Sequence, residues 1–170
     1  MKRIIIFFCC LLAFSFISRA QMAFVNSKYI LTRMPDYPDS LAKLNNLTAF
    51  WQKEVDDKQA ILEKMKKDFE KDEALLTDES KKKRTDEIFY YEKDLRDLQR
   101  RHFGFEGDLF KKKQELIKPI EHRVNVAIQS TATRLSYTIV LDKSESNTVM
   151  YAKSTLDITE EVERELGIIK

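Results

Sequence analysis

Residues of the types that usually carry catalysis are few in this chain of 170 residues and are poorly placed to act together. The two histidines, His102 and His122, fall in one predicted helical region and lie too far apart along it to share a site. No histidine–cysteine group has the spacing of a zinc site, and three glycines in the whole chain are too few for a phosphate-binding loop. We therefore predict no catalytic residue, no metal and no cofactor, and expect a protein that is not an enzyme.

The element that would position His102 is a long charged stretch from Asp39 to Lys118, which contains no proline. Apolar residues recur through it with the period of about 3.5 residues that is typical of a coiled coil. In the first half, the residues in this phase are Leu41, Leu44, Thr48, Trp51, Val55, Lys58, Leu62, Met65, Phe69, Asp72 and Leu76. In the second half they are Ile88, Tyr91, Leu95, Leu98, His102, Phe105, Leu109, Lys112 and Leu116. Most of these positions are apolar and form a predicted seam, in which His102 is a polar layer.

A turn is predicted between the two runs of the seam. Thr77 or Asp78 can cap a second helix, because a short side-chain oxygen accepts hydrogen bonds from the free amides of a first helical turn. We therefore expect an antiparallel helical-hairpin coiled coil over residues 39–118, with its tip near residues 76–78. A single uninterrupted helix in a parallel rod is the alternative, since no proline or glycine forces the turn.

The first 20 residues have the organisation of a secretory signal peptide. A basic start at Lys2 and Arg3 precedes an apolar run over residues 4–16, and Ala20 closes a cleavage site with small residues. The apolar run is shorter than the roughly 20 residues that span a bilayer, so cleavage is favoured over an uncleaved anchor. Cleavage removes both cysteines, and the exported chain then has no disulfide framework.

Charge is balanced in the chain that remains after cleavage. The leader carries basic residues and no acidic ones, so its loss brings the chain close to neutrality from the net charge of +2 for the full sequence. Basic and acidic residues are equal in number from Lys53 to Lys118. This balance is typical of a solvated coiled-coil surface, and it argues against a nucleic-acid partner.

The remaining segments, 21–38 and 119–170, are predicted to fold together as a small β body with short helices. Residues 22–26 and 137–142 are predicted strands, and residues 148–152 a further strand antiparallel to the second. A capping box over residues 157–160 predicts a closing helix. Pro38 is expected to delay the hairpin helix until Asp39 or Ser40, and Pro119 to restart a helix that ends near Leu135. So small a body cannot bury a large core alone, and neighbouring copies are predicted to complete it.

The order of these elements across the mature chain resembles the Skp/OmpH family of periplasmic chaperones. After the signal peptide, the residues that carry the resemblance are Ala23-Phe24-Val25-Asn26, Ile30-Leu31, the charged hairpin, Leu116, Pro119-Ile120, Ala127-Ile128, Tyr137-Thr138-Ile139-Val140-Leu141-Asp142, Val149-Met150-Tyr151-Ala152 and Asp157-Ile158-Thr159 with Val162. The resemblance implies an α+β fold in which a trimeric, β-barrel-like body carries three helical arms around a cavity. It also implies an ATP-independent holdase of the Gram-negative periplasm, which binds unfolded outer-membrane β-barrel proteins and prevents their aggregation.

Four aromatic residues outside the seam are the candidate client-binding side chains: Phe89, Tyr90, Phe103 and Phe110. Phe89, Phe103 and Phe110 share one heptad phase and form a predicted aromatic stripe. Exposed apolar patches mark interaction surfaces, and aromatic rings supply large contact areas. The alternative is that these residues widen the hairpin seam or pack where the hairpin meets the body.

The basic cluster near the hairpin tip, Lys81, Lys82, Lys83 and Arg84, is a candidate contact for anionic lipid headgroups or lipopolysaccharide. Acidic residues surround it, so a solvated helix surface is the alternative. The hairpin is neutral by count, whereas the arms of the best-known family members are markedly basic. Apolar contact would therefore have to contribute more to client binding than electrostatic attraction.

The apolar strands supply the candidate trimer core, which comprises Phe24, Val25, Ile139 and Leu141. A structural coiled-coil spacer or adaptor of the cell envelope is the alternative function. A spacer favours an uninterrupted apolar seam and rigid helices. The polar residues in the predicted seam argue mildly against it.

Overall fold

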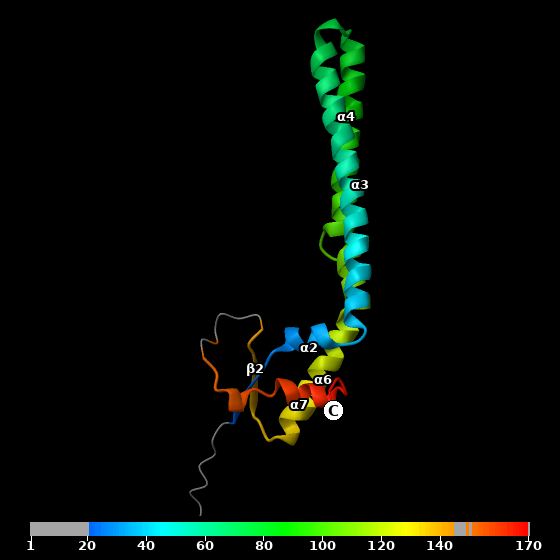
Figure 1. The fold of residues 1–170 in the computed structure, drawn as a ribbon. Coiled ribbons are helices and arrows are strands. Elements are labelled where there is room, and N and C mark those ends of the chain that lie inside the picture. Colours follow the sequence, from blue (N-terminus) through cyan, green and yellow to red (C-terminus); the bar gives the residue numbers. More distant parts are fainter. Residues whose placement is uncertain (1–20, 145–148, 150, 170) are drawn as a thin grey trace, which may run out of the picture. The chain divides into compact units, whose positions relative to one another are not determined.

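The computed structural model describes residues 21–144, 149 and 151–169. The predicted signal peptide lies outside these residues. The described chain divides into two compact units. One, the body unit, comprises the residues up to Ile30 and those from Val124 onward; the other, the arm unit, comprises Leu31–Arg123. Helices predominate, and the sheet has two strands (Figure 1).

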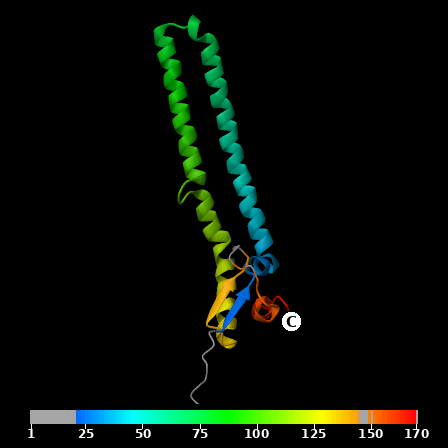
Figure 2. The same cartoon turned by 90° about the vertical axis from the view of Figure 1, so that its left-hand side faces the viewer.

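Two long helices form most of the arm unit. Helix α3 (Tyr37–Asp72) ends in the short 3-10 helix η1 (Glu73–Leu75), and α4 (Asp78–Phe103) returns antiparallel beside α3 (Figure 2). Thr77 is the N-cap of α4, and its hydroxyl oxygen accepts a hydrogen bond from the Ser80 amide at 3.3 Å. This bond satisfies one of the amides that the first turn leaves free, so the second helix begins there.

The seam between α3 and α4 is built mainly from residues at the predicted positions. Val55 and Leu62 of α3 are buried with Leu95 of α4. Four partly buried residues pack against this cluster: Ile88, Tyr91, Leu98 and Phe103. Burial of one such aliphatic side chain contributes about 1.5–3 kcal/mol, so the seam is the main source of stability within the hairpin.

The second run of the seam is interrupted, which its periodicity did not predict. α4 ends at Phe103, and α5 (Asp108–Leu116) begins after the linking loop Gly104–Gly107. An added Cβ would lie 2.3 Å from the Arg100 carbonyl oxygen at Gly104 and 2.7 Å from the Arg101 carbonyl oxygen at Gly107. The chain therefore folds tightly against the end of α4 at these two glycines, where a larger residue does not fit.

The interruption moves Phe105 out of the seam. It was expected on the apolar face, but it lies in the loop and is 95 % exposed. Its neighbour Glu106 has a φ of 52°, in the left-handed region. The helical periodicity of the sequence does not reveal such a loop, because the residues before and after it keep the same heptad spacing.

The two prolines at the ends of the long stretch lie inside first helical turns. α3 begins at Tyr37 with Pro38 in its first turn, so the expected delay to Asp39 was wrong. α6 (Lys118–Arg134) likewise contains Pro119 in its first turn. Proline is tolerated there because the amide it lacks would have no partner within the helix.

The body unit contains a parallel pair of strands. β1 (Met22–Val25) pairs with β2 (Ile139–Asp142) in the register Met22 to Ile139 and Val25 to Asp142. Phe24 makes a further parallel bridge to Asp157 on the other side of β1. The first described residues are thus held between segments more than a hundred positions away, as the sequence predicted.

The C-terminal part of the body unit differs from the prediction in one strand. Thr148 and Met150 of the expected strand at 148–152 lie outside the described residues, and Val149, Tyr151 and Ala152 belong to no strand. The chain continues instead through the 3-10 helix η2 (Ser154–Leu156) to α7 (Thr159–Glu165).

The closing helix α7 is anchored to the first strand. The Asp157 carboxylate accepts a hydrogen bond from the Thr159 amide at 3.0 Å, and the Thr159 hydroxyl oxygen accepts one from the Asn26 amide at 3.0 Å. Val162 is fully buried. The other short helix, α2 (Ser27–Arg33), begins with the Asn26 carboxamide oxygen accepting a hydrogen bond from the Tyr29 amide at 3.0 Å, so Asn26 caps it.

Candidate functional site

The predicted aromatic stripe is exposed at two of its three positions. Phe89 and Phe110 are 54 % and 46 % exposed. Phe103 packs instead against the buried seam, with its ring edge-on to His102 at 6.2 Å. Tyr90 is exposed beside Phe89, and their rings meet edge-on at 5.8 Å. Phe103 therefore widens the hairpin seam, which was the alternative to client binding for these aromatic residues.

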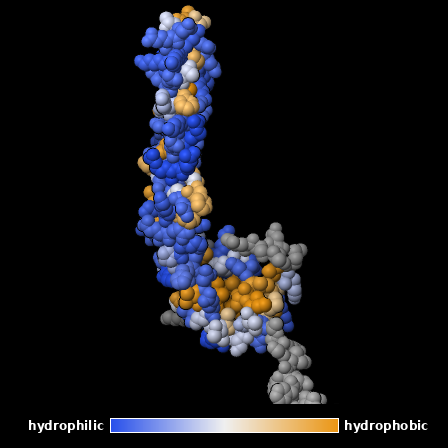
Figure 3. All heavy atoms as spheres, turned by 180° about the vertical axis from the view of Figure 1, so that it is seen from behind, coloured by the Kyte–Doolittle hydropathy of each residue, from blue (hydrophilic) through white to orange (hydrophobic). Residues whose placement is uncertain are grey.

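The arm unit exposes further apolar side chains that the sequence reasoning had not singled out for binding. These are Phe50, Ile61, Leu75 and Phe105. Phe50 and Ile61 each lie one residue before a seam position, while Leu75 lies at the tip and Phe105 in the linking loop. Figure 3 shows hydrophobic groups scattered along the arm between hydrophilic surface. The useful signal in the sequence is a pair of adjacent apolar residues, because a narrow seam can bury only one of the two.

The predicted trimer-core residues fall into two groups in the single chain. Phe24 and Val25 are buried within the body unit, whereas Ile139 and Leu141 are 45 % and 38 % exposed. Residues two apart in a strand project from the same face, so β2 presents one apolar face to the outside. Figure 3 also shows a broad hydrophobic area at the body. Exposed apolar surface of this kind marks a contact with another molecule.

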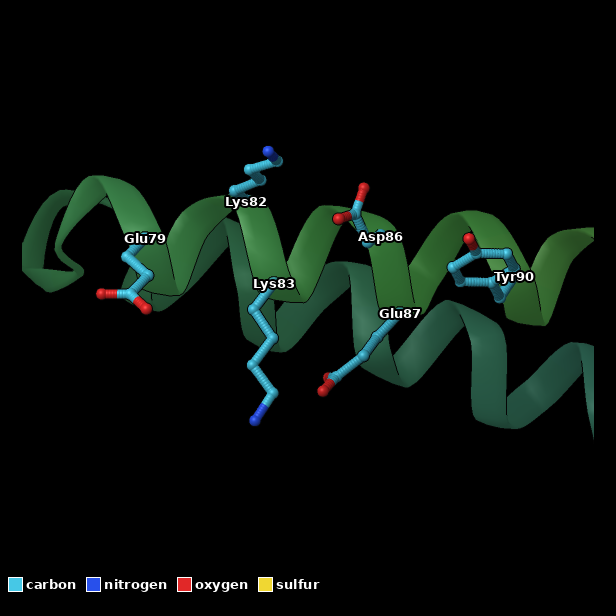
Figure 4. A pocket seen from close by; sticks show the side chains of 6 residues that line it. All are labelled: Glu79, Lys82, Lys83, Asp86, Glu87 and Tyr90. Atoms are coloured by element: carbon cyan, nitrogen blue, oxygen red, sulfur yellow. The ribbon is translucent and has the colours of Figure 1, made fainter.

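The basic cluster lies in the first turns of α4, mixed with carboxylates. Lys82 and Lys83 line a shallow pocket together with Glu79, Asp86, Glu87 and Tyr90. In Figure 4 these two lysines point in different directions from α4, and carboxylates lie on both sides of them. The cluster therefore lacks a concentrated positive surface, which favours the alternative of a solvated helix face.

His102 is a polar layer in the seam, as its phase predicted, and it lies where α4 ends. Its Nδ1 is 2.8 Å from Asp108 Oδ2 of α5, and its Nε2 is 3.4 Å from Glu54 Oε2 of α3. The imidazole ring is buried and stacks on the indole of Trp51, with ring centroids 5.2 Å apart and planes at 11°. The side chain of His102 thus connects its own helix α4 with α3 and α5. The sequence did not predict Asp108 as its partner.

A second polar seam residue reaches outward to an opposite charge. Lys58 Nζ lies 3.5 Å from Asp94 Oδ2 and 4.9 Å from the centre of the Tyr91 ring. Lys66 Nζ lies 2.5 Å from Glu92 Oε1, and this hydrogen bond and charge lower the pKa of Glu92 below its ordinary value. Charges on the two long helices therefore pair across the seam rather than concentrate on one face.

Two aspartates of the body unit, Asp142 and Asp157, accept several hydrogen bonds. Burial raises the pKa of Asp142, but hydrogen bonds from Ser27 and Ser144 outweigh it and lower the pKa overall. Burial likewise raises the pKa of Asp157, and hydrogen bonds from Lys143 and Thr159 lower it overall. The Asp142 carboxylate therefore links β2 to Ser27, which is more than a hundred positions away, whereas the Asp157 carboxylate links to the nearer Lys143 and Thr159.

Within residues 21–144, 149 and 151–169, no group of three or more histidine, cysteine, aspartate or glutamate side chains is arranged to hold a metal ion. No helix in the same part of the chain is long and apolar enough to cross a membrane.

The geometry defines a mostly helical protein with a small two-stranded sheet and a long helical hairpin. The sequence model of the OmpH-like outer membrane proteins matches residues 21–166, and the chain belongs to this family. The predicted resemblance is thereby confirmed. The family is not enzymatic, so the expectation of a non-enzyme is confirmed as well.

A solved structure shares the fold. It is that of a candidate outer membrane chaperone (OmpH-like) from Caulobacter crescentus, with a TM-score of 0.59 and 12 % sequence identity. The similarity covers 89 % of this chain and 85 % of that one. No curated protein sequence matches the chain.

Proposed function

We propose that this protein is an ATP-independent holdase chaperone of the periplasm. In this proposal it binds unfolded outer-membrane β-barrel proteins between the arms of a homotrimer and prevents their aggregation. Membership of the OmpH-like family supports a chaperone role. The observation that carries the proposal is the set of apolar side chains exposed along the arm unit, which has no internal use in the hairpin.

The distribution of these side chains suits reversible holding of an unfolded chain. Burial of one aromatic or large aliphatic side chain contributes about 1.5–3 kcal/mol at most, so one contact alone would bind only weakly. Several contacts spread along α3, α4 and the linking loop add up on a flexible client, and each can be released without ATP. Because charges pair across the seam, apolar contact is the main attraction in this proposal.

The proposed trimer uses the exposed face of β2. Ile139 and Leu141 lie on an apolar strand face that the single chain leaves uncovered. Three copies would cover this face and bring three arms together around one cavity. Phe24 and Val25 support the strand from within each copy, since both are buried in the single chain.

The test is the native mass of residues 21–170 mixed with a urea-denatured outer-membrane β-barrel protein on dilution into buffer. We expect a soluble species of three copies plus one client. A well-folded oligomer beside a precipitated client would refute holding and would favour the structural spacer or adaptor. A soluble complex that contains one copy per client would refute the trimer while leaving the holding activity.

A further inference from the structure

The joint between α4 and α5 is closed by side chains rather than by continuous helix. Gly107 is the N-cap residue of α5, and no side chain caps that helix end. The Gly107 amide donates to the Gly104 carbonyl oxygen at 3.0 Å, which closes the loop on itself. Asp108, the first residue of α5, then reaches back to His102 in the last turn of α4. This contact spans the interruption and ties the two helices together.

The hydrogen bonding of the His102 ring depends on its protonation. An ionised carboxylate can only accept, so Nδ1 carries the proton that it donates to Asp108. In the neutral ring, Nε2 then has a lone pair, and it faces the Glu54 carboxylate at 3.4 Å. Two acceptors in such a position repel each other. A proton on Nε2 turns the same contact into an ion pair, and the indole face of Trp51 favours the cation too.

We propose that His102 is a proton-dependent clasp that fastens the α4–α5 joint to α3. The charged groups that face its ring are Glu54 on α3 and Asp108 on α5. When the ring is protonated it bridges both, and when it is neutral it holds only Asp108. The loop that this clasp holds carries the exposed Phe105, so in a chaperone the clasp would also fix where that side chain is presented.

The direction of the pH dependence follows from this geometry. Histidine side chains gain their second proton as the pH falls from about 8 to about 5. The contact with Glu54 therefore exists in the acidic part of that range and is lost in the alkaline part. The joint should open more often as the pH rises.

Trp51 is the only tryptophan of the chain and reports directly on the ring. A protonated imidazole stacked on an indole quenches its fluorescence. In the wild-type protein without client, we expect Trp51 emission to fall in one step between pH 8 and pH 5.5. His102→Gln should abolish the step, whereas His122→Gln, which changes the other and exposed histidine, should leave it unchanged. A step that persists in His102→Gln, or no step in the wild type, would overturn the proposal.

Opening of the joint is measured by trypsin cleavage after Arg100 and Arg101, which flank it. Cleavage after Lys71, exposed near the far end of α3, serves as the internal reference for the activity of trypsin itself. We expect the ratio to rise roughly threefold from pH 6 to pH 8, as suits one ion pair between a buried ring and a partly exposed carboxylate.

The variant Glu54→Gln distinguishes a proton-dependent contact between His102 and α3 from a histidine that is simply buried. This variant should keep the fluorescence step, because the imidazole of His102 still stacks on Trp51. It should show a smaller rise of the cleavage ratio with pH, because only the contact with Asp108 then strengthens on protonation. A cleavage ratio that rises with pH as steeply in Glu54→Gln as in the wild type would refute the clasp. None of these measurements contains a client, so their failure leaves the proposed holdase function untouched.

Discussion

Removal of the exposed aromatic side chains of the second half of the hairpin should weaken client holding without loosening the hairpin. The variant combines Phe89→Ser, Phe105→Ser and Phe110→Ser and leaves Phe103 in place, because Phe103 packs against the seam. The exposed fractions of the three side chains together correspond to about two fully exposed phenylalanines. Full burial of these in a complex would contribute about 3–6 kcal/mol.

An unfolded client covers only part of this surface at any time. We therefore expect a loss of about 1.5–3 kcal/mol, which is a weakening of holding by roughly tenfold to a hundredfold. The assay is light scattering of a urea-denatured outer-membrane β-barrel protein diluted into increasing concentrations of the variant. The concentration that halves the scattering should rise by that factor.

The matched control changes exposed polar residues of the same region, Glu87, Arg101 and Lys111, to serine. Both variants should keep the native mass of the wild type, and each substitution should change the free energy of unfolding by no more than about 0.5 kcal/mol. Equal suppression of scattering by the aromatic variant and the wild type would refute the role assigned to these side chains. An equal loss in the polar control would show that the effect is not one of apolar contact.

Three further predictions concern the packing that supports this surface. Leu95→Ala, in the buried seam, should lower the free energy of unfolding by about 2–5 kcal/mol in urea titrations, whereas Leu75→Ala at the exposed tip should change it by less than about 0.5 kcal/mol. Leu141→Asp should give a folded monomer in sedimentation velocity, because the single chain tolerates a charge at this exposed site while a trimer would bury it unpaired; a variant that stays trimeric would contradict the assignment of β2. The lowered pKa values of Asp142 and Asp157 mean that their contribution is complete at neutral pH and is lost as the pH falls below the ordinary value of 3.8. Asp142→Asn should therefore be less stable than the wild type at pH 7, and the difference should shrink in acid.

The sequence was most informative where a single periodicity decides the structure. Val55, Leu62 and Leu95 are buried at seam positions that the heptad pattern alone identifies. The pairing of β1 with β2 was likewise predictable, because both are short apolar segments that need a partner. Local chemistry limited the cap of α4 to Thr77 or Asp78, and the structure has it at Thr77.

The interruption after Phe103 was not predictable from the same pattern. In the sequence, apolar residues on both sides of the loop keep the same heptad spacing, so the interruption leaves no mark in the pattern. The two glycines were visible in the sequence, but glycine alone signals a weak point and not a break. As a consequence, Phe105 was assigned to the seam and Phe103 to the surface, and the structure exchanges the two. The contact of His102 with Asp108 depends on the same loop and was hidden for the same reason.

The exchange of Phe103 and Phe105 bears on the choice between a holdase and a spacer. In a spacer, the natural place for an aromatic residue at a seam position is inside the seam, where it adds stiffness. Here the loop turns Phe105 outward, and the seam is filled by Phe103 and a polar layer at His102. A loop of this kind costs the helix several backbone hydrogen bonds and gives no stiffness in return. The loop is explained if the exposed aromatic side chain that it carries has a function of its own. A protein that binds an unfolded chain through many weak contacts has such a use for it.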